Sequence, residues 1–364
     1  MYRHKFVRHG LGPMLLLLPL IGCSSIGPAV IPRDRTDYLS SIADSWKEQN
    51  LLNVVRIRYG DVPSFLDVSS VISSYAVGGQ LSAGGVINSN LTSVAPWNTA
   101  TFGANVAYQD RPTISYTPIS GDKFTKSLLR PITPVGIFQL VQAGYAADFV
   151  LQVTVRALNG VRNQVSMGGR VQPADPAFYQ LLEAFRRLQL SGAVSLRLEK
   201  RGPEEIGILV LASSRTPQVD QDLKFVLDTL HLRLGKDNET TIAFGAVQRS
   251  DHELAVLSRS MAEILLELAS GIEVPAEDVA EGRTMPSARL ASAENPRERP
   301  LARILAGPAA PSDAFTAIRY RNTWYWIDNR DFASKRVFTA LMIFFSLAET
   351  GVTPQVPALT IPVN

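Results

Sequence analysis

The sequence predicts an α+β fold, in which helices and mostly antiparallel strands occupy separate stretches of one chain. Residues 36–52 carry apolar side chains at intervals of three and four, the period of a helix, whereas residues 75–87 and 102–108 alternate with a period of two. Residues 174–247 then follow the order helix, strand, strand, helix, strand. No internal repeat is found.

The first 22 residues have the pattern of a secretion signal. Three basic residues, Arg3, Lys5 and Arg8, precede an apolar run over residues 11–21, which is shorter than the ~20 residues that a spanning helix needs. The run ends at Leu20-Ile21-Gly22-Cys23, which contains the only cysteine of the chain.

These four residues resemble the lipobox of bacterial lipoproteins, a likeness that is confined to the first 25 residues or so of the chain. The resemblance implies that the thiol of Cys23 receives a diacylglyceryl group and that signal peptidase II cuts between Gly22 and Cys23. Acyl chains such as palmitate would then anchor the protein. Ser24, in place of aspartate, implies the cell outer membrane. The alternative is an ordinary signal peptide with an incidental cysteine.

Removal of residues 1–22 would take away three of the 36 basic residues and none of the 33 acidic ones, which leaves no formal net charge. A neutral chain lacks the cationic field that attracts phosphates, so nucleic acid is not an expected partner. With Cys23 acylated, no disulfide can form within the chain, and apolar burial must stabilise the fold. Residues 23–35 are expected to form a lipidated tether.

The first predicted domain covers residues 36–165. Beyond its helix and its two alternating segments, it is expected to contain an extended piece at residues 113–116 and a short helix at residues 135–143. Residues 149–158 have the pattern of a strand that leads into Asn159-Gly160, a strong hairpin signal.

The two alternating segments allow two interpretations. Tyr75, Phe102 and Tyr108 lie near their ends and Trp97 lies between them, as aromatic residues do at the interfaces of transmembrane strands. An oligomeric outer-membrane pore could take one such hairpin from each subunit. A half-buried antiparallel sheet gives the same alternation, and it is the preferred interpretation because two strands cannot close a barrel alone.

The central domain, residues 174–280, is expected to end in a further helix at residues 251–269. Its helix-strand-strand-helix-strand order resembles the small ring-building modules of envelope secretion machines, some of which are lipoproteins. Residues 281–312 are rich in Pro, Ala and Arg and are expected to be a linker. Residues 313–350 predict a hairpin followed by a buried helix, and residues 351–364 a proline-rich tail.

Few residues offer catalytic chemistry, and none is assigned a catalytic role. Only His231 and His252 remain beyond the leader, so no metal site and no cofactor are expected. Ser250 and Glu253 fit a capping box for the helix at residues 251–269. A cell-wall glycan hydrolase stays open as an alternative, because it needs only two acids about 5 to 9 Å apart. The candidate pairs are Glu204 with Glu205, Asp220 with Asp222, and Glu273 with Glu277.

The carboxyl-terminal hairpin supplies a candidate partner-binding face. If Asn322-Thr323 forms the turn, Arg321 opposes Trp324 and Arg319 opposes Trp326 on one face, while the other face is apolar. Tryptophan and arginine could stack on a glycan or hold a protein partner. They could equally seal the edge of the core.

The sequence therefore predicts a non-enzymatic lipoprotein that is lipid-anchored in the bacterial outer membrane and faces the periplasm. It would act as a membrane-tethered scaffold or interaction protein of an envelope or secretion assembly. The expected partners are the membrane and either a protein, including further copies of this chain, or cell-wall glycan. The glycan hydrolase and the oligomeric pore remain as alternatives.

Overall fold

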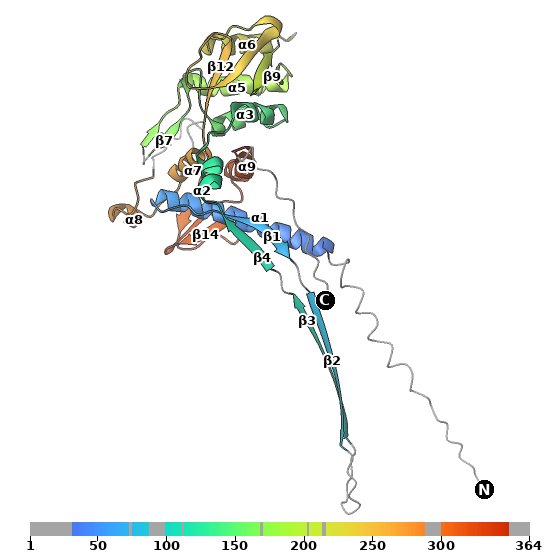
Figure 1. Cartoon of the computed structure of the whole chain (residues 1–364). Helices are drawn as coiled ribbons and strands as arrows, with labels where there is room; N and C mark the ends of the chain where they lie inside the picture. The colour runs from blue at the N-terminus through green and yellow to red at the C-terminus, as the bar shows by residue number, and fades with distance from the viewer. Residues whose placement is uncertain are drawn as a thin grey trace, which may run out of the picture.

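The computed structural model describes residues 31–72, 75–86, 99–110, 113–167, 170–201, 204–212, 216–287 and 300–348. These residues form a stack of helices and small sheets, from one end of which a long β-hairpin projects (Figure 1). The mixture of helices with mainly antiparallel sheets confirms the predicted α+β class.

A six-stranded mixed sheet lies at the end of the body farthest from the projecting hairpin (Figure 1). Only the β11–β12 pairing is parallel. The sheet draws on both segments that the sequence assigned to separate domains. Its strands, in spatial order, are β6 (Val161–Arg162), β5 (Val155–Leu158), β12 (Glu253–Ser258), β11 (Glu239–Phe244), β10 (Glu204–Leu211) and β9 (Val194–Arg201).

Four helices pack in and around this sheet: α3 (Pro134–Gln142), α4 (Ala147–Thr154), α5 (Pro176–Leu190) and α6 (Pro217–Thr229). The order α5, β9, β10, α6, β11 is the predicted one. Both α5 and α6 begin with a proline, Pro176 and Pro217, because proline fits the first helical turn, where its missing N–H has no partner to lose. The 3₁₀ turn η3 (Lys236–Asn238) precedes β11.

Two predictions about secondary structure are wrong. Residues 147–154 form helix α4 and only residues 155–158 form a strand, where the sequence predicted a strand over 149–158. Residues 253–258 form the inner strand β12, and a helix begins only at Met261, where the sequence predicted a helix over 251–269. Both runs are buried on nearly every side, so their apolar pattern has no period that distinguishes helix from strand.

The expected capping box lies ten residues further along the chain. Helix α7 (Met261–Ser270) is capped by Ser260, whose hydroxyl accepts from the backbone N–H of Glu263 at 3.2 Å, while the Glu263 carboxylate accepts from the N–H of Ser260 at 2.9 Å. The Ser250–Glu253 pair has the same spacing but lies in the turn before β12. Spacing alone therefore did not identify the helix start.

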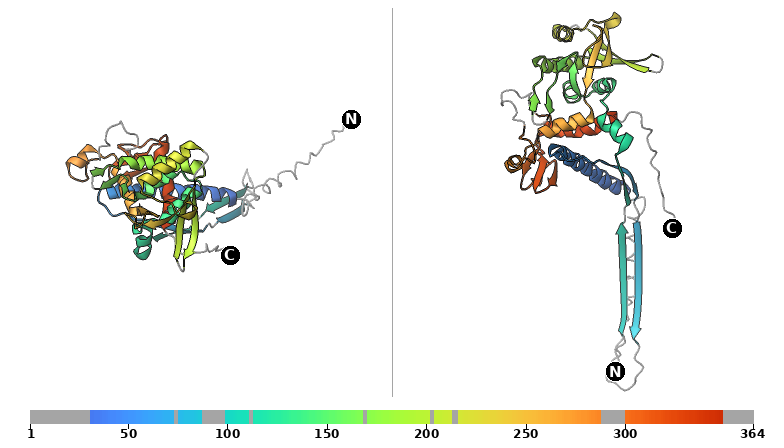
Figure 2. Two further views of the ribbon diagram at one scale, coloured as in Figure 1. Left: turned by 90° about the horizontal axis from the view of Figure 1, so that it is seen from above. Right: turned by 60° about the vertical axis from the view of Figure 1, so that its left-hand side comes forward.

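The other end of the body is built around two long helices, α1 (Ile31–Arg58) and α9 (Phe332–Ala348), and α7 packs against both (Figures 1 and 2). The predicted burial of the carboxyl-terminal helix is confirmed at Phe338, Leu341 and Phe344, each at most 1% exposed. None of the helices within the described ranges combines the length and the apolar character that crossing a membrane requires. The remaining short pieces are α2 (Gly121–Phe124), the π-helical turn η2 (Thr125–Leu129), α8 (Ala276–Ala280) and the small hairpin of β7 (Val165–Met167) and β8 (Arg170–Gln172).

A three-stranded sheet packs against α1 and consists of β13 (Leu305–Gly307), β15 (Thr323–Ile327) and β14 (Thr316–Tyr320). Strand β13 comes from the segment that the sequence treated as a linker. The neighbouring Ala302 and Ile304 are buried in the core, so at least residues 300–307 belong to the folded body. Residues 288–299 lie outside the described ranges, as does the tail 351–364.

The projecting hairpin consists of β2 (Tyr75–Val86) and β3 (Thr99–Asp110), which we call the ribbon. A second antiparallel pair, β1 (Leu66–Ile72) and β4 (Thr113–Pro118), joins it to the body and is called the root. The preferred interpretation of a half-buried sheet is wrong for the ribbon. Every ribbon residue with a described exposure is exposed, and Phe102 reaches 85%. The strands pair with each other, and among the described elements no third strand joins them.

Candidate functional site

The ribbon has an uninterrupted register of twelve residue pairs, from Tyr75 opposite Asp110 to Val86 opposite Thr99. Directly opposed residues share a face, and successive residues alternate between faces. The register therefore assigns every position of the ribbon to one of two faces.

One face of the ribbon collects apolar residue types and the other collects small and polar ones. The apolar face holds the odd-numbered positions of β2 and the even-numbered positions of β3, among them Ala83 opposite Phe102. The polar face holds the complementary positions. They include Gln80 opposite Asn105, Ser82 opposite Gly103, and Gly84 opposite Thr101.

The polar face is flat because hydroxyls lie over glycines. The Ser82 hydroxyl donates to the carbonyl of Gly103 at 3.3 Å, and the Thr101 hydroxyl donates to that of Gly84 at 3.1 Å. A Cβ at Gly103 would lie 2.7 Å from the Ser82 hydroxyl, closer than side-chain contacts allow, so glycine is required while the serine keeps this position. The hydroxyls thus bond within the ribbon and leave the face smooth.

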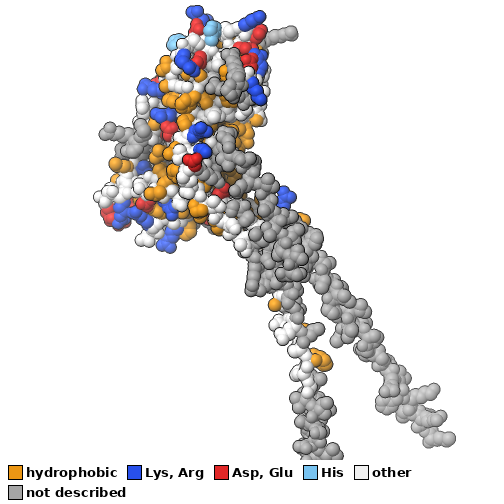
Figure 3. All heavy atoms as spheres, in the orientation of Figure 1, with side chains coloured by type: hydrophobic (Ala, Val, Ile, Leu, Met, Phe, Trp, Pro, Cys, Tyr) orange, Lys and Arg blue, Asp and Glu red, His pale blue; other side chains and the backbone are white. Residues whose placement is uncertain are grey.

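The ribbon also differs from the body in charge. Its two strands contain one residue that is charged at neutral pH, Asp110, at the end next to the root. Figure 3 shows Lys, Arg, Asp and Glu side chains spread over the body, whereas the part of the ribbon that it colours is orange and white. An uncharged strand pair with an apolar face is unusual on a surface exposed to water.

The middle of α1 lies beside the root. The side-chain amide of Gln49 makes two hydrogen bonds to the backbone of Leu66. Its Oε1 accepts from the N–H at 2.8 Å and its Nε2 donates to the carbonyl at 3.1 Å, which ties α1 to the start of β1. Ile42, one turn before Trp46, lines a pocket of about 530 Å³ together with Tyr116 of β4. The start of α1 is therefore on the side of the body from which the ribbon projects, as Figures 1 and 2 show.

Gly22 and Cys23, the predicted cleavage and lipidation residues, lie outside the described residues. The first described residue is Ile31, the start of α1. Seven residues lie between it and Cys23, and the eight steps from one Cα to the next extend at most ~28 Å. A lipid on Cys23 would therefore be held within that distance of the amino-terminal end of α1.

The predicted face on the carboxyl-terminal hairpin is partly assembled. Arg319 opposes Trp324, not Trp326, so the expected register is wrong by two residues. The turn is Arg321-Asn322, with a φ of 54° at Arg321, in place of the expected Asn322-Thr323. A shift of two leaves each strand residue on its expected face, because faces alternate.

Arg319 and Trp324 line a groove of about 620 Å³ between α1 and β14, together with Arg56 and Glu48. Trp326 is covered, since a Cβ at Gly307 of β13 would lie 3.1 Å from its ring. Only two of the four predicted residues thus share an open groove. Their role in partner binding stays a prediction.

Arg321 turns inward toward the body. Its guanidinium lies 5.4 Å from the ring centres of Tyr59 and Tyr320, and 3.9 Å from a carboxylate oxygen of Asp61. These contacts give the side chain a role in joining the hairpin to the end of α1.

The same junction contains a buried polar cluster that sequence reasoning missed. The Tyr59 hydroxyl donates to the Asp278 carboxylate at 2.5 Å and lies 2.6 Å from the hydroxyl of Tyr325, which is fully buried. Burial raises the pKa of Tyr59, and the neighbouring Asp278 adds to the increase. The hydrogen bond from Tyr59 and the ion pair with Arg283 at 2.7 Å lower the pKa of Asp278.

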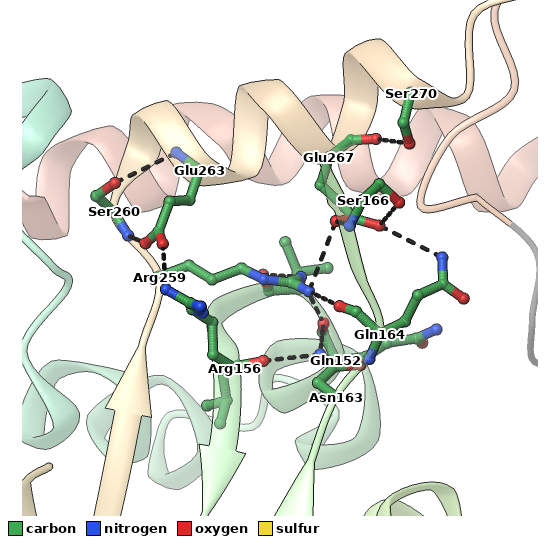
Figure 4. Close-up of polar contacts among 12 residues, drawn as sticks. Gln152, Arg156, Asn163, Gln164, Ser166, Arg259, Ser260, Glu263, Glu267 and Ser270 are labelled. Atoms are coloured by element: carbon green, nitrogen blue, oxygen red, sulfur yellow. Dashed lines mark hydrogen bonds and ion pairs between the residues drawn. The ribbon is translucent and has the colours of Figure 1, made fainter. Parts of the chain in front are cut away.

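A second missed cluster surrounds Arg259 (Figure 4). Its guanidinium, 2% exposed, donates to the carbonyls of Gln152, Val153 and Gln164 and lies 3.9 Å from the Glu267 carboxylate. Glu267, which is also buried, accepts from the backbone N–H and the hydroxyl of Ser166 at 2.8 and 2.7 Å. The cluster joins α4, α7 and β7. An arginine and a glutamate within an otherwise apolar run were the available signal.

In two of the three predicted acid pairs, one carboxylate is bonded to an arginine. Asp222 accepts two hydrogen bonds from Arg187, both at 2.8 Å, and this contact lowers its pKa. Glu273 is bonded to Arg303 at 2.9 Å and lines a cavity of about 750 Å³ that Glu277 does not line. The side chains of Glu204 and Glu205 lie outside the described part. Over the residues whose placement is described, no group of three or more His, Cys, Asp or Glu side chains could hold a metal ion.

Comparison of this chain with protein-family models, with curated proteins and with solved structures finds no match. The functional argument therefore depends on the chain's own geometry.

Proposed function

We propose that this chain is a non-enzymatic lipoprotein of the bacterial outer membrane that is anchored by lipid on Cys23 and inserts its ribbon into the same membrane. The body then serves as a periplasmic scaffold for an envelope assembly. The observation that carries the proposal is the projecting ribbon, which has one mainly apolar face and one polar face and, among the described elements, no third strand paired with it.

The dimensions of the ribbon support insertion. Twelve residues extend ~40 Å along a strand. At the ~40° tilt of outer-membrane strands, this length crosses ~30 Å, more than the ~25 Å apolar band of such proteins. A two-stranded hairpin exposed to water is marginally stable at best, so an apolar environment on one face would stabilise it.

The position of the predicted anchor supports the same orientation. The tether can hold the lipid near the start of α1, which lies on the side of the body from which the ribbon projects (Figure 1). Lipid and ribbon would then enter the membrane from the same side of the body, so neither has to reach around it.

Two buried carboxylates, Asp222 and Asp278, lack the raised pKa that the acid of a glycan hydrolase needs. A hydrolase of this class needs an acid whose pKa is raised so that it is protonated near neutral pH. The pKa values of Asp222 and Asp278 are instead lowered, mainly by hydrogen bonds from Arg187 and Tyr59. Both carboxylates are ionised at neutral pH and act as hydrogen-bond acceptors.

The test uses single cysteines in the full lipidated chain, in which acylated Cys23 offers no free thiol. Cysteine is introduced at Ala83 or Phe102 on the apolar face and at Ser82 or Thr101 on the polar face, then labelled with an environment-sensitive fluorophore in outer-membrane vesicles. We expect lipid-embedded quenchers to reach the apolar-face labels and aqueous quenchers to reach the polar-face labels.

A label at Ser312, an exposed residue of the body, is the control for a fully aqueous site. If all four ribbon positions behave like Ser312, the ribbon does not enter the membrane and the proposal is wrong.

A further inference from the structure

The two outer edges of the ribbon carry backbone N–H and C=O groups that need hydrogen-bond partners when the ribbon is in a membrane. In an antiparallel pair, every second residue of each strand directs its N–H and C=O away from the partner strand. In the described fold, these outward groups of β2 and β3 meet no third strand. Within a bilayer, each unsatisfied backbone group costs several kcal/mol, so an inserted ribbon must have both edges paired.

We propose that each free edge of the ribbon pairs with the ribbon of a second copy of this chain, so that identical copies close one transmembrane β-barrel with the polar faces lining its lumen. This inference rests on the proposed insertion of the ribbon and adds its partner. Known outer-membrane barrels have at least eight strands, which corresponds to about four or more copies at two strands each.

The residue types of β2 and β3 favour pairing with a further strand, because these strands lack the charges that usually protect an edge strand from association. Strand β9, an edge strand of the six-stranded sheet, carries Arg197, Glu199, Lys200 and Arg201, and such charges discourage edge-to-edge association in water. The twelve residues of β2 carry no charge, and β3 carries only Asp110. The same chain therefore protects one edge with charge and leaves the two ribbon edges open.

A second copy fits these edges for geometric reasons. Copies that are anchored by the same lipid insert from the same side, so β3 of one copy runs antiparallel to β2 of the next, as in all barrels of this class. The interface is head to tail and can close into a ring. Lipid anchoring also confines the copies to one surface and raises their effective concentration.

The polar face has the chemistry of an aqueous lumen. Gln80, Ser82, Thr101 and Asn105 are uncharged, and Gly84 and Gly103 leave room between them. A lumen without charged side chains passes small ions of both signs, so the wild-type channel should show little selectivity between cations and anions.

Crosslinking between copies tests the partner. Two variants of the full lipidated chain are expressed together, one with Ser82→Cys and the other with a single cysteine at one of positions 99 to 107. Because each copy has one free thiol, an 82–β3 disulfide can join only different copies. We expect a dimer with an odd-numbered β3 position, about tenfold more abundant than with the even-numbered positions, since only odd positions share the face of Ser82.

The outcomes separate this inference from the proposed function. Absence of a dimer at all nine positions, or crosslinks to another protein only, contradicts pairing between copies, while the fluorophore experiment decides insertion independently. Equal crosslinking at odd and even positions also contradicts pairing between copies. If all copies place their polar faces on the same side of the barrel, only odd-numbered β3 positions lie on the face of Ser82.

Planar-bilayer recordings test the lumen with the purified lipidated protein. We expect discrete channels, and Ser82→Lys should shift the reversal potential in a KCl gradient toward that of chloride. The matched variant Ala83→Lys places the same charge on the lipid-facing side and should abolish channels, since a lysine at mid-bilayer is costly. No conductance, or an equal shift from both variants, overturns the barrel.

Discussion

The six-stranded sheet and the ribbon are both built mainly from antiparallel strands, yet they are stabilised differently. In the sheet, Leu209, Leu254 and Val256 are fully buried beneath helices. In the ribbon, Phe102 is 85% exposed and no described helix covers either face. One structure is complete within the chain, and the other requires surroundings that the chain does not supply.

This difference indicates that the body, and not the ribbon, contributes most of the chain's folding stability in water. Apolar side chains contribute to stability only when folding removes them from water. The body achieves this by itself, whereas the ribbon would do so only in a membrane or an assembly. The body should therefore be sensitive to single substitutions in dilute solution, and the ribbon should be insensitive there.

The largest loss of stability is expected from a substitution of the buried Arg259, which tests whether the body depends on its own buried contacts. Arg259→Met should lower the free energy of unfolding by roughly 3–5 kcal/mol, because Glu267 would remain as a buried, uncompensated charge. Urea denaturation of a soluble Cys23→Ala background measures it. The same substitution at Arg162, whose exposed side chain is 3.5 Å from Asp175, should cost less than ~1 kcal/mol. Equal effects would show that burial of the pair is unimportant.

The next effect concerns the tyrosine cluster at the end of α1. Tyr59→Phe removes the hydroxyl that bonds to Asp278 and Tyr325, and should cost about 1.5–3 kcal/mol, since a charged acceptor loses a buried donor. Tyr116→Phe at the root, where the side chain is 54% exposed, is the matched control and should change stability by less than ~0.5 kcal/mol. A large loss from Tyr116→Phe instead would mean that the root belongs to the core.

A smaller, pH-dependent effect is expected for the Asp222–Arg187 pair between α5 and α6. The lowered pKa of Asp222 means that the pair stabilises the fold above the ordinary aspartate range and that this stability is lost as pH falls through the folded-state pKa. Asp222→Asn should therefore cost about 1 kcal/mol at pH 7 and progressively less below pH ~4.

Urea unfolding of both proteins across this pH range measures the difference. Asp228→Asn, an exposed position on the same helix, controls for the change in net charge. A gap between wild type and Asp222→Asn that does not narrow in acid would show that the carboxylate charge is not what stabilises the pair.

The sequence predicted local features of the fold well. Helices that begin at Pro176 and Pro217, the turn at Asn159-Gly160, and the buried carboxyl-terminal helix depend on neighbouring residues in the chain, so their signals are visible in it. It failed over residues 149–158 and 251–269, where apolar residues on all sides erase the period. Those assignments depend on tertiary contacts.

The candidate site was predictable in part for the same reason. The alternation of the ribbon revealed two strands and their two faces, because strand faces follow from residue order. It did not reveal whether the apolar face meets protein or lipid, since the pattern is the same in both environments. The Arg259 cluster was not predictable, because it brings together residues about 100 positions apart in the chain, as its bond to Gln164 shows.

The smallest change in stability is expected from the deletion of the whole ribbon, which tests directly whether the body folds without it. Deletion of residues 75–110 removes the whole ribbon and leaves a four-residue connection between Ile72 and Thr113, which already oppose each other in the root. In soluble monomer, this deletion should change the free energy of unfolding by less than ~0.5 kcal/mol, because the ribbon pairs with no other described strand and its residues of described exposure are all exposed. The lipidated form of the same variant should lose both the intercopy dimer and the channels. A loss of several kcal/mol in the soluble form would instead make the ribbon part of the body's own fold, and its exposed faces would then need another explanation.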